Sequence, residues 1–378
     1  MKKLPANFDG NITVENRYHF TNLKDCRFNV ELINFRKPNE RLHCNIIGKT
    51  YDVTASSIVP LAKATMQLNL PTDWAQYDAI RLRAFDPQGN EVDMWTWKTK
   101  ENLQLVSLEM PKATSAVELG DSTDYYSLKG AGIALIINKK NGLLDKVTTD
   151  LGYNLSFGQG PVLVSGYAEF KSISHFAEGD NHIVEVLFDG DLKFVRWTMQ
   201  PNGWVKLDYE YANTGQVPFA GISFNYPESN VISAKWLGRG PARVWKNRVL
   251  GGTLDVCENI YNNTQTGQSP WNYPEFKGYF ADMGWMEMST AEGKFLVVSQ
   301  QDDLFLRLFD FYALTNKLPH PSLPVGDISF LDVIPPIGTK MATGLSTRTA
   351  QLGPNSELAN VSGTVSRSLY FYIKVKKP

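Results

Sequence analysis

Cationic and aromatic side chains gather in two short segments of the chain, residues 239–248 and 271–277. Guanidinium groups are planar and carry several donors, so they can hold sugar hydroxyls or a carboxylated sugar. Aromatic rings can stack on a pyranose, because both apolar faces lose water on contact. These segments therefore predict a carbohydrate-binding surface. Its candidate residues are Arg239, Arg243, Trp245, Lys246, Arg248, Trp271, Tyr273, Glu275, Lys277 and His320.

A plainer interpretation of the same residues is structural. A basic loop can be solvated or can form salt bridges, and tryptophans are more often buried or at interfaces than on a ligand. A retaining glycosidase needs two carboxyl groups about 5–5.5 Å apart. Glu258, Glu275 and Asp282 are scattered acids of the kind that usually solvate loops, so the sequence nominates no catalytic pair.

Metal, cofactor and nucleic-acid functions find no support in the composition. Cys26, Cys44 and Cys257 have no CxxC spacing, and the five histidines show no metal-ligand spacing. We therefore predict neither a metal nor a cofactor. A formal net charge of -1 supplies no attraction to a phosphate backbone, which argues against nucleic acid as a partner.

No apolar run approaches the roughly 20 residues that cross a bilayer. Residues 1–10 carry two lysines without an apolar segment behind them, so they do not form a signal peptide. The sequence leaves the compartment open between periplasm and cytoplasm. It also leaves open whether Met1 is a natural start.

The order of short alternating segments predicts an all-β protein with more than one domain. With 378 residues, the chain exceeds the roughly 250–300 that one hydrophobic core usually serves. Strand and turn signals over residues 1–105 favour an immunoglobulin-like sandwich. We expect residues 106–124 to be a linker. Residues 125–378 show strands without intervening amphipathic helices, which favours a large two-sheet sandwich over a (β/α)₈ barrel.

The segment WLGRGP, residues 236–241, contains two glycines and a proline, which predict that a strand ends in a rigid corner there. It resembles the W-L-G-x-G-P signature of the β-galactosidase small-chain domain of glycoside hydrolase family 2. Residues 274–278 (PEFKG) stand where that family has a P-x-E-N-G-like turn. Residues 20–23 (FTNL) resemble the start of the preceding immunoglobulin-like domain.

This resemblance implies a galactose-mutarotase-like supersandwich for residues 125–378. It also implies that the catalytic carboxylates of the family lie on a barrel that this chain does not contain. The family's early acidic segment has no equivalent at residues 157–163, and two of its arginines are replaced by Phe280 and Gly284. These departures put a specificity for galactose in doubt.

Three hypotheses for function follow. The first is a non-catalytic C-terminal segment of a family 2 glycoside hydrolase of β-galactosidase type. Such a segment would be inactive alone, would support the catalytic barrel as its partner and would line part of the sugar site. The second is a free-standing carbohydrate-binding module. The third is an aldose mutarotase, for which His320 would supply the acid or base.

Overall fold

The computed structural model describes residues 3–40, 44–106, 116–263, 275–311, 322–337 and 357–375. These residues form an all-β protein, as predicted, with one short helix, α1 (Asn102–Leu105). The chain divides into two compact units, Met1–Ser107 with Thr253–Val256, and Leu108–Gly252 with Cys257–Pro378. No helix in the described ranges is long and apolar enough to cross a membrane.

The first unit contains a four-stranded antiparallel sheet in the order β3-β2-β5-β6 and a two-stranded sheet, β1-β4. In β2, Phe28, Val30 and Leu32 are buried, as the alternation predicts, and they share one core with Met66 and Leu68 near β4. An immunoglobulin-like topology for this unit stays a prediction. The strands are β1 (Asn11–Glu15), β2 (Arg27–Asn34), β3 (Ile46–Val53), β4 (Lys63–Gln67), β5 (Ala79–Phe85) and β6 (Glu91–Lys98). The 3₁₀ turns are η1 (Leu23–Asp25) and η2 (Trp74–Gln76).

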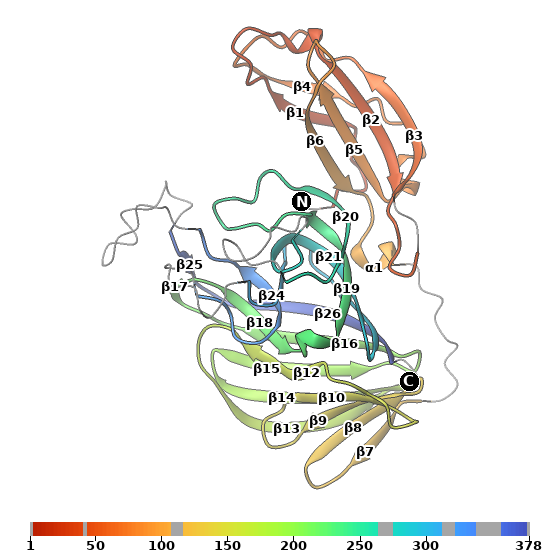
Figure 1. Ribbon diagram of the computed structural model, residues 1–378, viewed down its shortest axis with the longest axis vertical. Coiled ribbons are helices and arrows are strands. Elements are labelled where there is room, and N and C mark those ends of the chain that lie inside the picture. Colours follow the sequence, from red (N-terminus) through yellow and green to blue (C-terminus); the bar gives the residue numbers. More distant parts are fainter. Residues whose placement is uncertain are drawn as a thin grey trace. The chain divides into compact units, whose positions relative to one another are not determined.

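The second unit is built on a long curled antiparallel sheet, in which β13, β14, β15, β16, β26, β22, β21 and β19 pair in succession (Figure 1). A second run pairs β12, β18, β24, β23 and the first residues of β21. The strands of these two runs are β12 (Gly158–Leu163), β13 (Ala168–Glu178), β14 (Asn181–Gly190), β15 (Leu192–Met199), β16 (Trp204–Tyr211), β18 (Ala220–Asn225), β19 (Val231–Gly240), β21 (Gly278–Thr290), β22 (Gly293–Ser299), β23 (Phe305–Leu308), β24 (Ile328–Val333) and β26 (Val365–Val375).

A third run pairs β7 through β10 and continues to β11 and β12. Its first strand, β7, lies inside the range 106–124 that the sequence analysis assigns to a linker. The remaining elements are β7 (Glu118–Asp121), β8 (Tyr125–Gly130), β9 (Ile133–Asn138), β10 (Leu144–Thr149), β11 (Asn154–Leu155), β17 (Gly215–Val217), β20 (Thr253–Ile260), β25 (Ala359–Val361) and the 3₁₀ turn η3 (Glu228–Asn230). Together the runs enclose one large apolar core.

The WLGRGP segment ends a strand, as predicted: β19 finishes at Gly240, and Pro241 begins a bend. Strand β19 continues through both of its glycines to Gly240, with a register shift against β21 between Leu237 and Arg239. Trp236 is fully buried, and its ring lies 4.5 Å from that of Phe280. A Cβ on Gly240 would stand 2.8 Å from Sγ of Cys257. Gly240 is the last residue of β19, and its missing side chain lets the end of the strand lie against Cys257.

Candidate functional site

Two predicted residues, Arg243 and Glu275, form a buried ion pair. The Nε atom of Arg243 lies 3.0 Å from Oε2 of Glu275, and each side chain is 7% exposed. The Nε–H group is not aligned for a hydrogen bond, but the same oxygen accepts one from the backbone N–H of Arg243 at 3.3 Å. The Arg243 guanidinium also lies over the ring of Phe311, 4.6 Å from its centroid. We call these three residues the Arg243 cluster.

Local backbone brings the Arg243 cluster together. Gly278 opens β21 with a φ of +137°, and a Cβ there would stand 2.8 Å from Cβ of Arg243. Asn259 holds the segment before this strand, since its Nδ2 donates to the backbone oxygen of Glu275 at 3.0 Å. Only glycine at position 278 gives Arg243 the room to pack beside the strand.

Three other candidate residues, Arg239, Lys277 and Trp245, contact side chains of the protein itself. Arg239 pairs with Asp282, with Nε 3.1 Å from Oδ2, and Lys277 pairs with Glu228. Trp245 is 5% exposed and packs edge-on against Phe311, at 5.6 Å between ring centroids.

The two remaining described candidates belong to the same loop. The Nζ atom of Lys246 donates to the backbone oxygen of Glu357 at 2.6 Å. Arg248 is exposed and is held to Trp245 by backbone hydrogen bonds. Trp271, Tyr273 and His320 lie outside the described residues, so their roles stay predictions.

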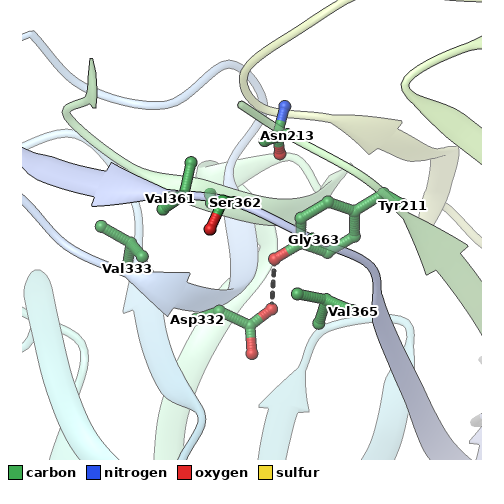
Figure 2. A pocket seen from close by; sticks show the side chains of 9 residues that line it. Tyr211, Asn213, Asp332, Val333, Val361, Ser362, Gly363 and Val365 are labelled. Atoms are coloured by element: carbon green, nitrogen blue, oxygen red, sulfur yellow. Dashed lines mark hydrogen bonds between the residues drawn. The ribbon is translucent and has the colours of Figure 1, made fainter. Parts of the chain in front are cut away.

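A second polar site lies where β16, β18, β24 and β26 meet. It is a cavity of about 50 Å³, which we call the Asp332 cavity (Figure 2). Valine, alanine and glycine supply most of its wall, and the polar side chains come from four residues. Its lining is Tyr211, Asn213, Ala220, Asp332, Val333, Val361, Ser362, Gly363 and Val365.

Strand pairing places these side chains together although they are distant in the sequence. Tyr211 ends β16 and pairs with Val365 at the start of β26. Ala220 begins β18 and pairs with Val333, so Asp332 arrives at the same edge from the end of β24. The hydroxyl of Tyr211 donates a hydrogen bond to Oδ2 of Asp332, as Figure 2 shows.

Asp332 carries the charge of this site. Burial raises the pKa of its carboxyl group, although Arg367 acts in the opposite direction. Arg367 donates from Nε to Oδ1 of Asp332 at 2.7 Å and from Nη1 to Oδ1 of Asp303 at 2.9 Å. Burial also raises the pKa of Tyr211 far above its ordinary value, so this phenol stays protonated.

The side-chain amide oxygen of Asn213 has no hydrogen-bond donor as a partner. The residue is 5% exposed, and its Nδ2 donates to the backbone oxygen of Ser165 at 2.9 Å. Its Oδ1 is buried and accepts no hydrogen bond. In Figure 2 this oxygen lies on the side of the amide that faces the other cavity residues. A buried unpaired acceptor costs roughly 1–3 kcal/mol, so the site favours a group that donates to it.

The sequence analysis did not nominate Tyr211, Asn213, Asp332 or Arg367 as site residues. The one local signal is that Asp332 is an acidic residue near the end of β24, a strand whose residues 328–331 are all buried. No group of three or more potential metal ligands among His, Cys, Asp and Glu occurs in the part of the chain that the structure describes.

No family model and no curated protein sequence matches this chain, so the resemblance to glycoside hydrolase family 2 stays a prediction. Among solved structures, a putative aldose 1-epimerase from Escherichia coli K12 has 9% identity and a TM-score of 0.34, over 67% of this chain and 99% of that one. A galactose 1-epimerase from Lactobacillus acidophilus has 11% identity and a TM-score of 0.36, over 72% and 100%.

Proposed function

We propose that this chain is a carbohydrate-binding β-sandwich protein that recognises a sugar without hydrolysing it. The observation that carries the proposal is the Asp332 cavity, which is lined both by Asp332 and by Asn213, whose buried Oδ1 accepts no hydrogen bond. A partly apolar pocket with a few converging polar groups is the usual form of a small-molecule site. Acceptors of this kind match the hydroxyl donors that a sugar carries.

The size of the cavity decides which part of a sugar enters. A water-sized group needs roughly 10–15 Å³ of such space, so a volume of about 50 Å³ holds about three to five of them. A whole pyranose ring carries more atoms than that. The ring would therefore stay at the mouth, near the exposed Ser362 and Gly363, while one substituent reaches Asn213 and Asp332.

Calorimetric titration with a panel of monosaccharides and disaccharides tests this proposal. We expect saturable binding that weakens about tenfold or more in Asn213→Ala, because a hydrogen bond from the ligand is lost. Val361→Leu, which narrows the cavity and leaves its polar groups in place, should weaken binding too. Asn154→Ala changes an exposed asparagine on β11 and should bind as the wild type does. Binding that neither cavity variant alters would refute the site.

Aldose mutarotation is a second candidate, favoured by the hydrogen bond between Tyr211 and Asp332. Mutarotation takes a proton from the anomeric hydroxyl and returns one to the ring oxygen, which a carboxylate and an acid can share. The raised pKa of Tyr211 makes it a poor proton donor, so we favour binding. Polarimetry should distinguish the two, since a mutarotase would accelerate anomer interconversion and lose that effect in Asp332→Asn. An unchanged rate with wild-type protein would exclude the candidate.

Membership of a larger glycoside hydrolase is a further part of the proposal. Its support is the order of the WLGRGP and PEFKG segments in the sequence. In the structure, the glycines of both segments permit close backbone packing, and the described polar residues around them pair with one another. This arrangement fits a supporting domain better than a catalytic one.

A further inference from the structure

The polar atoms of the Asp332 cavity are almost all acceptors. Asn213 presents Oδ1, because its Nδ2 is committed to Ser165 and this bond fixes the orientation of the amide. The hydroxyl of Tyr211 already donates its one hydrogen bond to Asp332, so towards a ligand its oxygen can only accept. The hydroxyl of Ser362 is the one side chain of the lining that could still donate.

The carboxylate of Asp332 keeps accepting capacity as well. Its Oδ1 is in contact with both Nε and Nη2 of Arg367, and its Oδ2 accepts the hydroxyl of Tyr211, which leaves one lone-pair site on Oδ2. Arg367 is not part of the lining, and it is shared between Asp332 and Asp303. No lysine or arginine lines the cavity in the described residues.

The polar substituents of sugars differ in how many hydrogen-bond donors they carry. A carboxylate has no donor and would find one donor in the lining, the hydroxyl of Ser362, among the acceptors of Asn213, Asp332 and Tyr211. A hydroxyl has one donor and can satisfy one of the three acceptor groups. A primary ammonium has three donors and no acceptor, and its charge strengthens each bond. With about 50 Å³ available, the ammonium group fits inside while the ring carbon that bears it stays at the mouth.

We infer that the Asp332 cavity selects a primary ammonium group, and that the preferred ligand is a sugar with a free amino group. The identification of the ligand as a sugar rests on the proposed function, whereas the preference for ammonium rests on Asn213, Asp332 and Tyr211. The ammonium would donate to Oδ1 of Asn213, to Asp332 and to the oxygen of Tyr211.

Titration with matched ligands tests this inference. Galactosamine and glucosamine would be compared with galactose and glucose, with the N-acetylated amino sugars, and with galacturonate. We expect the free amino sugars to bind about tenfold or more tightly than the neutral parents. Acetylation should abolish the preference, because it removes the charge and two donors. Galacturonate should bind most weakly.

Site variants and a small amine, methylammonium, distinguish the ammonium inference from the proposed carbohydrate binding. Methylammonium alone should bind weakly to the wild type and lose binding in Asn213→Ala, while melting temperatures confirm folding and Asn154→Ala serves as control. If amino and neutral sugars bind equally and Asn213→Ala weakens both, the ammonium inference is wrong and carbohydrate binding stands. If methylammonium binds at Asn213 and no sugar binds, carbohydrate binding is wrong and the ammonium site stands. If neither binds, both are wrong.

The pH dependence gives an independent readout. Binding needs an ionised Asp332 and a protonated amine. Because burial raises the pKa of Asp332, affinity should fall as the pH drops through that raised value. It should fall again as the pH rises through the pKa of the ligand amine, whereas neutral sugars should show no loss on the alkaline side. An affinity for galactosamine that stays constant across both limbs contradicts the inference.

Discussion

Trp236→Ala is expected to lower the free energy of unfolding of the second unit by about 3–5 kcal/mol. The indole is fully buried, packs on Phe280 and fills the space beside Gly240. Its removal leaves a cavity that strands β19 and β21 cannot close, since both are held by their ladder of backbone pairs. The free energy of unfolding of a domain is typically only about 5–15 kcal/mol, so the expected loss is a large fraction of its stability.

Urea unfolding followed by circular dichroism measures this effect. Trp236→Phe keeps most of the packed ring and should cost clearly less than the alanine variant. Tyr167→Ala, at a residue that is 59% exposed, should stay within about 0.5 kcal/mol of wild type. A midpoint for Trp236→Ala equal to that of Tyr167→Ala would show that WLGRGP does not anchor the core.

Glu275→Ala should destabilise the second unit by about 3–5 kcal/mol, because it leaves the charge of Arg243 buried without its partner. The two side chains are each 7% exposed, so water cannot readily replace the carboxylate. The backbone N–H of Arg243 would lose its acceptor in the same variant. Denaturant titration of the single variants gives the cost.

A double variant provides the control for this pair. Arg243→Met with Glu275→Leu removes both charges and fills similar volume, so it should be substantially more stable than Glu275→Ala alone. Sugar binding at the Asp332 cavity should survive in the double variant, because neither residue lines that cavity. A double variant as unstable as the single one would mean that the carboxylate supports the loop through its hydrogen bonds and not its charge.

Local periodicity was enough to predict much of the fold. In β16, Val205, Leu207, Tyr209 and Tyr211 alternate with polar residues, and all four are buried, because successive side chains of a strand point to opposite faces. The glycines and the proline of WLGRGP also predicted the end of a strand, and β19 ends there, at Gly240. The first of these glycines, Gly238, lies within the strand, at a register shift against β21.

The Asp332 cavity could not be predicted in this way. Tyr211 and Asp332 are 121 residues apart, and they meet only because β16 pairs with β26 while β18 pairs with β24. Composition and spacing carry no information about which distant strands become neighbours. The Arg243 cluster was easier to nominate, since charged and aromatic residues are concentrated in that part of the sequence. Such a concentration, however, does not distinguish a ligand site from a buried ion pair.

A crystal structure of the protein with a bound sugar tests the central claim most directly. Galactosamine and galactose would be used as separate ligands. The account predicts that one polar substituent of the sugar lies within hydrogen-bond distance of Oδ1 of Asn213 and of the Asp332 carboxylate, with the ring at the mouth beside Ser362. A sugar bound instead at the Arg243 cluster, with only water in the Asp332 cavity, would contradict it.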